Sequence, residues 1–339
     1  MSGAFGWHQH DVTTGSARQA DDPFSQAAKA YKAPAAPSTR AKVVDPVQSP
    51  APSRILPSMV TRTVPGATGK LRSTAANVLV VSMDVTGSMG EWPAEIFKRL
   101  PLLYHEACEY LGSDDLEILF IAHGDAGGDR NPLQVARFGR GQELDDILAS
   151  FDVARGGLGN GHESHELVLY KLVRDVDTSS AVNAHLFLLT DEPARDVLDD
   201  GEVQSVFGKP IEGELRSTPA LARELLRRMN LWTVLCATGT YDPTPIRNWW
   251  ERLLGPERVL PLSDHRRVVD VILATLAKQT GQLDQFALKL RSRQAGSLYA
   301  DQNVRTVLAS VAMVGTRGPN APRMIAGPGT KSLLPGKKS

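Results

Sequence analysis

Residues 77–90 read Asn-Val-Leu-Val-Val-Ser-Met-Asp-Val-Thr-Gly-Ser-Met-Gly, with Asp84, Thr86 and Ser88 at alternate positions. An apolar segment of strand length therefore ends in a carboxylate and two hydroxyls. Alternate side chains share one side of an extended chain, and the glycines between and after them let the backbone curl so that the three oxygens converge. Converging hard oxygens suit Mg²⁺ or Mn²⁺ better than Zn²⁺. The stretch predicts a divalent-metal site where a buried strand opens into a turn.

Composition narrows the class of protein. The chain has 339 residues, of which 42% are hydrophobic and 22% charged, as in a soluble globular protein with one sizeable core and additional segments. The 38 basic residues balance the 38 acidic ones, which argues against a nucleic-acid binder because phosphate contacts need a basic face. No run approaches the roughly 18 apolar residues of a membrane span, and the start lacks a signal-peptide pattern. Cys108 and Cys236 lie in apolar segments and are expected to be buried thiols in a reducing cytoplasm.

Apolar segments alternate with amphipathic ones through the middle of the chain. Strands are predicted at residues 78–83, 116–122, 135–138, 185–190, 232–237 and 258–262. Helices are predicted at residues 94–111, 143–150, 162–174, 219–229, 244–254 and 266–278. Strands with little polar alternation, separated by helices, imply a parallel sheet that is covered on both faces. The predicted fold class is therefore α/β, with a doubly wound and mostly parallel sheet.

The chain divides into four predicted parts. Residues 1–75 are rich in Pro, Ala and Ser and are expected to form a disordered arm. The core covers residues 76–280, and residues 316–339 form a loop-like tail. Between them, residues 281–315 hold a helical piece and an apolar run at 304–314, predicted as a helix/strand extension. The sequence leaves open whether this extension wraps the sheet or forms a small appendix.

The Asp84-x-Thr86-x-Ser88 motif, between a predicted strand and a predicted helix, resembles the metal-ion-dependent adhesion site of von Willebrand factor A (VWA) domains, whose signature is Asp-x-Ser/Thr-x-Ser. The resemblance covers residues 77 to about 280 and implies a Rossmann-like VWA fold. The family's Asp after the fourth core strand matches Asp191, which follows the strand at 185–190. Asp191 is expected to bind the metal directly or through water, although its other possible role is that of a helix N-cap.

The chain departs from the family pattern in one loop. VWA domains usually supply a Thr ligand from a Gly-rich loop, but residues 155–164 contain no Thr and look like the Gly-Gly-x-x-x-x-Glu loops of intracellular members. Asn160 and Glu163 are the first candidate replacements, followed by Ser164. Glu163 has an equally good alternative role in offsetting the dipole of the next helix. Asp125, in an Asp/Gly-rich loop, either supports the metal ligands from behind or forms a turn.

The resemblance implies a binding module rather than an enzyme. In such domains a partner's Asp or Glu completes the coordination of the metal, and intracellular members often act with ring-forming ATPases or scaffold multi-protein assemblies. A serine hydrolase is the alternative, because Ser88, Asp191 and His265 occur in the chain order of α/β-hydrolases and residues 86–90 are one residue away from Gly-x-Ser-x-Gly. One of the two tryptophans at positions 249 and 250 is expected in the core, and a partner anchor is the less favoured of the roles open to the other.

Overall fold

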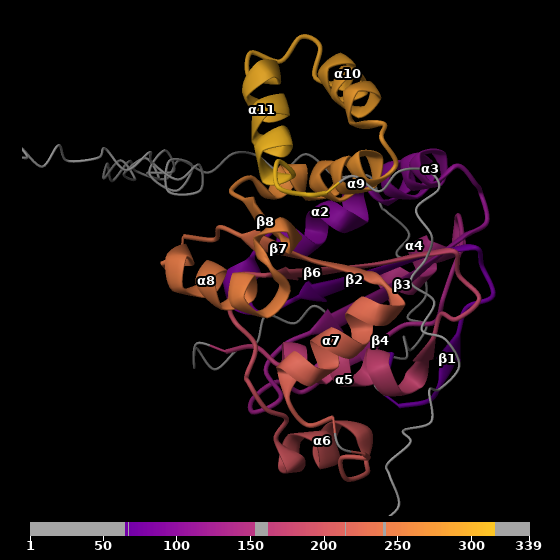
Figure 1. Ribbon diagram of the computed structural model, residues 1–339, viewed down its shortest axis with the longest axis vertical. Helices are drawn as coiled ribbons and strands as arrows, with labels where there is room; N and C mark the ends of the chain where they lie inside the picture. Colours follow the sequence, from indigo (N-terminus) through magenta and orange to yellow (C-terminus); the bar gives the residue numbers. More distant parts are fainter. Residues whose placement is uncertain (1–64, 67, 153–161, 214, 240–241, 316–339) are drawn as a thin grey trace, which may run out of the picture.

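The computed structural model describes residues 65–66, 68–152, 162–213, 215–239 and 242–315 (Figure 1). Six strands form the main sheet in the order β4-β3-β2-β6-β7-β8. Their bounds are β2 (Asn77–Asp84), β3 (Leu116–His123), β4 (Leu133–Val135), β6 (Asn183–Thr190), β7 (Asn230–Cys236) and β8 (Val259–Leu262). All neighbours pair in parallel except β3 and β4, which are antiparallel at one edge. The expected mixed α/β class with a mostly parallel sheet is confirmed.

The central strand, β2, shows why the sheet is covered on both sides. All eight of its residues are buried. Leu79, Val81 and Met83 belong to one apolar cluster, whereas Val78 and Val80 belong to the other. Successive side chains of a strand point to opposite faces, so a strand without polar alternation needs apolar cover above and below.

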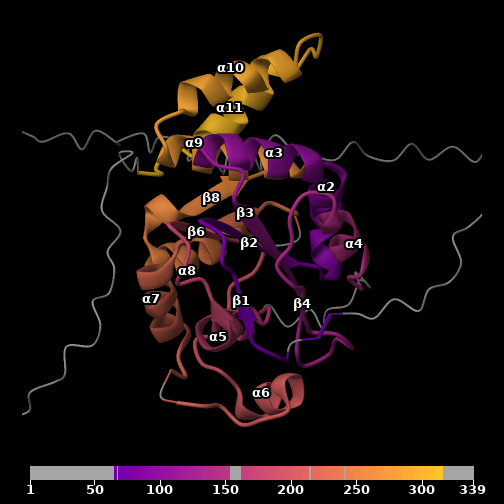
Figure 2. The ribbon, with the colours of Figure 1, turned by 90° about the vertical axis from the view of Figure 1, so that its right-hand side faces the viewer.

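Helices supply that cover in two layers, one on each face (Figure 2). The first layer comprises α2 (Trp92–Lys98), α3 (Leu100–Leu111), α4 (Glu143–Ala149) and α9 (Val268–Gln279). The second comprises α5 (His165–Asp175), α7 (Thr218–Arg228) and α8 (Pro243–Leu254). A short helix that the sequence did not indicate, α6 (Asp200–Phe207), lies beyond α5 (Figure 1).

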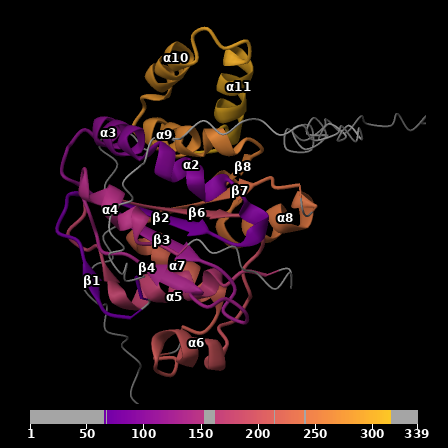
Figure 3. The same ribbon diagram turned by 180° about the vertical axis from the view of Figure 1, so that it is seen from behind.

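The segment at 281–315 is a helical hairpin on the outer side of α9 (Figure 3). It consists of α10 (Leu283–Arg293) and α11 (Ala300–Ser310). Val304 and Val307 are buried three residues apart, which is helical spacing. The expected strand at 304–314 is therefore wrong, and the extension is an appendix that enlarges one helical layer.

Two further expectations need correction. The helix expected at 94–111 is divided at Arg99, because Pro101 has no N–H to donate and its ring opposes a continuous helix. The arm expected at 1–75 ends earlier, since β1 (Leu71–Arg72) pairs in parallel with β5 (Val176–Asp177). The arm up to residue 64 and the tail from 316 lie outside the described residues.

Three smaller observations complete the fold. The buried Lys171 donates to the carbonyl of Gly69 and pairs with Asp175 at 3.1 Å, which ties the start of the described chain to α5. Cys108 and Cys236 are free thiols, and Cys236 is buried. In the described part of the chain, no helix combines the length and the apolar character needed to cross a membrane.

Candidate metal centre

The predicted ligands meet at one edge of the sheet because their strands run parallel and end in register. Asp84 closes β2 opposite His123, the last residue of β3. On the other side of β2, Met83 is paired with Leu189, so that Asp191 follows directly after the end of β6. Ligands of such sheets bind beyond the carboxyl ends of the strands. Residues 84, 86, 88 and 191, far apart in the chain, are therefore brought together as expected.

A continuous chain of hydrogen bonds links these residues. The Oδ1 atom of Asp84 accepts from the backbone N–H of Thr86 at 2.9 Å and from its hydroxyl at 2.7 Å. The hydroxyls of Thr86 and Ser88 are 3.3 Å apart, and Ser88 donates to Oδ1 of Asp191 at 3.1 Å. Two carboxylates and two hydroxyls thus form one compact oxygen cluster.

Asp84 is fully buried, and its second oxygen, Oδ2, has no hydrogen-bond partner. Burial raises the pKa of Asp84 well above its ordinary value, and the nearby Asp191 raises it further against the lowering effect of the Thr86 hydrogen bonds. Burial also raises the pKa of Asp191, which hydrogen bonds from Thr238 and Ser88 oppose. A buried carboxylate without compensation is costly, and either a proton or a cation would relieve that cost.

The surroundings of the cluster add a further acidic side chain. Glu163 is buried, its Oε2 atom has no hydrogen-bond partner, and burial together with Asp84 and Glu192 raises its pKa to about 10. The imidazole of His123 supplies no positive charge here, because burial lowers its pKa to about 3 and keeps it neutral. Acidic groups therefore dominate this end of the sheet.

The carboxylate of Asp125 is hydrogen-bonded within its own loop and to Arg195, not to the cluster at Asp84. Its Oδ1 atom accepts from the backbone N–H of Gly127 at 2.9 Å and from Arg195 at 3.2 Å. The neighbouring Gly124 leaves room for Asp129, because a Cβ at position 124 would lie 2.1 Å from Oδ2 of Asp129. Of the two roles considered for Asp125, the contacts fit a turn residue that orders the loop beside the site.

The Gly-rich loop is only partly visible. Asn160 lies outside the described residues. Glu163 does not belong to the helix that follows; it forms a bridge with Ala194, and α5 starts at His165. The hydroxyl of Ser164 accepts from the backbone N–H of Ala126 at 2.9 Å, which occupies it with loop packing. Glu163 is therefore the candidate replacement ligand that the described loop offers.

Residues outside the sequence motifs also support the site. Thr238, just after β7, donates to Oδ2 of Asp191 at 2.7 Å and so fixes its orientation. Trp250 is fully buried and donates from Nε1 to the carbonyl of Glu192 at 3.0 Å, while Trp249 is only half-buried. The sequence places Thr238 directly after a predicted strand, but a single Thr at such a position does not distinguish a site residue from an ordinary loop residue.

The donor set differs from that of a metal site rich in His, Cys or carboxylates. Among the described residues, no group of three or more His, Cys, Asp or Glu side chains is arranged to hold a metal ion. The cluster at Asp84 has only two carboxylates, with hydroxyls as its other oxygens. Its fit to a hard divalent cation rests on the unpartnered Oδ2 of Asp84 and on the all-oxygen donors.

Comparison with known proteins leaves the family open. No protein-family model and no curated relative matches the chain. The pilus adhesin SpaC from Lactobacillus rhamnosus GG shares 14% identity at a TM-score of 0.41, with 64% of this chain and 31% of the adhesin covered. Proximal thread matrix protein 1 from the mussel byssus shares 11% identity at a TM-score of 0.39, with 63% of this chain and 46% of that protein covered. The PilB minor pilin from Streptococcus sanguinis shares 11% identity at a TM-score of 0.38, with 62% of each chain covered. The chain thus spans about a third of the adhesin, and likenesses at these TM-scores carry no argument about function.

Proposed function

We propose that this protein is an intracellular VWA-type binding module. In this proposal one Mg²⁺ or Mn²⁺ is held by Asp84, Thr86, Ser88 and Asp191, and an Asp or Glu of a protein partner completes the coordination. The partner class is a ring-forming ATPase or another multi-protein assembly, and no catalytic activity is involved. The proposal rests on the sequence motif and on the oxygen cluster that the fold assembles from it.

The observation that carries the proposal is the buried and unpartnered Oδ2 of Asp84. A carboxylate that serves only the fold is normally paired or fully hydrogen-bonded at such depth. Here the nearest groups in the network are hydroxyls and a second carboxylate. Removing this arrangement from water is unfavourable unless a cation or a proton occupies it, and a divalent cation would satisfy both carboxylates together.

Each residue has a distinct part in this site. Asp84 and Asp191 supply the negative charge, while Thr86 and Ser88 supply neutral oxygens that add ligands without adding charge. Asp191 is oriented by Thr238 and Ser88. A bound ion would give an acidic partner group a strong electrostatic contact in a partly dry cleft.

The alternative of a serine hydrolase has less support. Ser88 donates directly to Asp191, whereas a catalytic triad needs a histidine between them. The ring of His265 lies edge-on against Trp92 at 6.1 Å, and in the described residues no hydrogen bond joins His265 to Ser88 or Asp191. We expect no labelling of Ser88 by a fluorophosphonate, and stoichiometric labelling would favour the hydrolase.

Calorimetry on the full chain tests the metal site directly. We expect one Mg²⁺ or Mn²⁺ per chain and no binding by Asp84→Ala, while Asp200→Ala, which removes an exposed carboxylate from α6, binds as the wild type does. Partners captured in Mg²⁺ should be released by a chelator and should not be retained by Asp84→Ala. Absence of metal binding by the folded wild type would rule out the proposal.

A further inference from the structure

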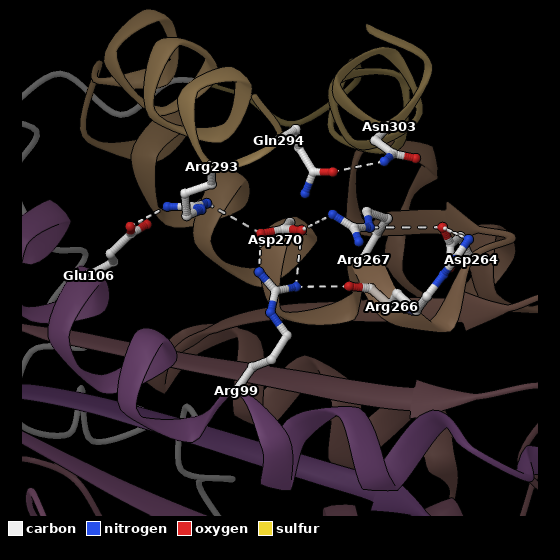
Figure 4. Close-up of polar contacts among 9 residues, drawn as sticks. All are labelled: Arg99, Glu106, Asp264, Arg266, Arg267, Asp270, Arg293, Gln294 and Asn303. Carbon is white, nitrogen blue, oxygen red and sulfur yellow. Dashed lines mark hydrogen bonds and ion pairs between the residues drawn. The ribbon is translucent and has the colours of Figure 1, made fainter. Parts of the chain in front are cut away.

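A second polar site lies away from the strand ends, on the outer side of the first helical layer (Figure 4). It is a pocket of about 420 Å³ between the junction of α2 and α3, the short turn η3 (His265–Arg267) and the end of α10. Four arginines line it, together with Glu95 and Leu102: Arg99, Arg266, Arg267 and Arg293. Nothing in the metal-site proposal uses these residues.

Two acidic partners of the arginines, Asp270 and Glu106, lie deeper than the arginines themselves. Asp270, on α9, is fully buried and accepts from Arg99 at 2.6 and 3.0 Å, from Arg267 at 3.2 Å and from Arg293 at 3.3 Å. Glu106 is also buried and pairs with Arg293. By contrast, the side chain of Arg266 is 64% exposed. Four arginines therefore line the pocket, and the carboxylate of Asp270 lies among three of them, Arg99, Arg267 and Arg293 (Figure 4).

The acids near the pocket do not use all of the N–H donors of the arginines. The four arginines face three acids, Asp264, Asp270 and Glu106, and Glu95 is paired with Lys98 at 2.8 Å. Each guanidinium also has five N–H donors, whereas Arg99 makes three hydrogen bonds, two to Asp270 and one to the carbonyl of Arg266. Donors thus remain for a ligand.

From this arrangement we infer that the pocket binds a small phosphorylated molecule through its phosphoryl group. Arginines that converge from three separate segments can contact several oxygens of a tetrahedral anion at once, and the guanidinium fork suits phosphate geometry. The arginines already bind one planar carboxylate, that of Asp270. We therefore expect the ligand to be a tetrahedral phosphoryl group and not a second carboxylate. The volume lies in the range of small-molecule pockets, and Leu102 offers an apolar contact to the rest of the ligand.

Calorimetric titration of the full chain with inorganic pyrophosphate tests the inference. The buffer is freed of divalent metal, so that binding through a metal at Asp84 cannot contribute, and Asp84→Ala should bind pyrophosphate as the wild type does. We expect one pyrophosphate per chain. Arg266→Gln and Arg293→Gln should each weaken binding about tenfold, the effect of one charged hydrogen bond.

Arg291→Gln is the matched control. Arg291 lies on α10 two residues before Arg293, is 56% exposed and pairs with Asp301 outside the pocket. Its loss should change the affinity less than about twofold. If Arg293→Gln does not fold, the exposed Arg266→Gln decides the test. Lack of binding by the wild type, equal weakening by Arg291→Gln, or tighter binding of citrate than of pyrophosphate would each overturn the inference.

Discussion

Asp84 and Asp270 are both fully buried carboxylates, but their surroundings are opposite. Asp270 accepts hydrogen bonds from three arginines on three different segments. Asp84 has one oxygen bonded only to Thr86 and another with no hydrogen-bond partner. The first carboxylate has its compensating charges within the fold, and the second has none among its hydrogen-bond partners. The feature that makes Asp84 the candidate ligand is therefore not its burial, which Asp270 shares, but the absence of compensating charge.

The largest expected difference concerns stability. Asp270→Ala leaves Arg99, Arg267 and Arg293 without their shared acceptor and should lower the free energy of unfolding by about 3–5 kcal/mol. Urea denaturation of the metal-free protein measures this loss. Asp301→Ala, which removes an exposed partner of Arg291, should lie within about 1 kcal/mol of the wild type. A loss of that small size for Asp270→Ala would mean that its arginine contacts stabilise the fold little.

Asp84→Ala should behave in the opposite way. Without metal the variant should remain folded, because removing the carboxylate relieves repulsion with Asp191 and leaves no large apolar cavity. Mg²⁺ at a hundred times its dissociation constant should stabilise the wild type by about 2.7 kcal/mol and the variant not at all. Thermal unfolding with and without Mg²⁺ gives both values. Unfolding of metal-free Asp84→Ala would make Asp84 a structural residue like Asp270.

Thr238→Val tests whether a residue that only orients a proposed ligand, Asp191, affects metal binding. Loss of its hydrogen bond to Asp191 should weaken Mg²⁺ binding about 10- to 100-fold, as expected for a group that orients a ligand. Thr233→Val on β7 is the matched control, because the buried Thr233 hydroxyl has no hydrogen-bond partner. This second variant should keep both metal affinity and stability. Equal metal affinities of the two variants in calorimetry would argue against a role for Thr238.

A more gradual expected effect is the pH dependence of the metal-free protein. The pKa of Glu163 is raised from 4.5 to about 10 in the folded state, so the folded protein binds more protons than the unfolded chain between these values. Stability from this group is therefore present below the lower pKa and is lost as pH rises, by up to about 1.4 kcal/mol per pH unit. Urea denaturation between pH 7 and 8.5 should show a decline that Glu163→Gln reduces. An unchanged slope in that variant would contradict the assignment.

Much of the sheet could be predicted because its strands are uniformly apolar. The strands expected at 78–83, 116–122 and 185–190 were found as β2, β3 and β6, each extended by one or two residues. The edge strand was displaced, from the expected 135–138 to Leu133–Val135. Edge pairing depends on the neighbouring strand, which local patterns do not contain. The helix α6 was missed because Gly201 and two acidic residues weaken its pattern.

The motif residues of the candidate site could also be predicted, because their relation to one another is local in the sequence. The spacing of Asp84, Thr86 and Ser88 is local, and a residue directly after a strand must lie at the sheet edge. Thr238 and the arginine pocket depend on which strands and helices are neighbours, and no motif marks them. The Arg99–Asp270 pair joins residues 171 positions apart. Such contacts are created by the tertiary fold and are absent from any local pattern.

The position of β2 also affects how the chain is made. This strand emerges before β6, yet it lies between β3 and β6, and its register with β6 pairs Asn77 with Asn183. At typical synthesis rates, more than a hundred intervening residues take about 5–20 seconds to appear. During that interval an eight-residue strand with five apolar side chains lacks one neighbour. Non-local parallel pairing is intrinsically slow, so the nascent chain is expected to need protection from aggregation until residue 190 has left the ribosome.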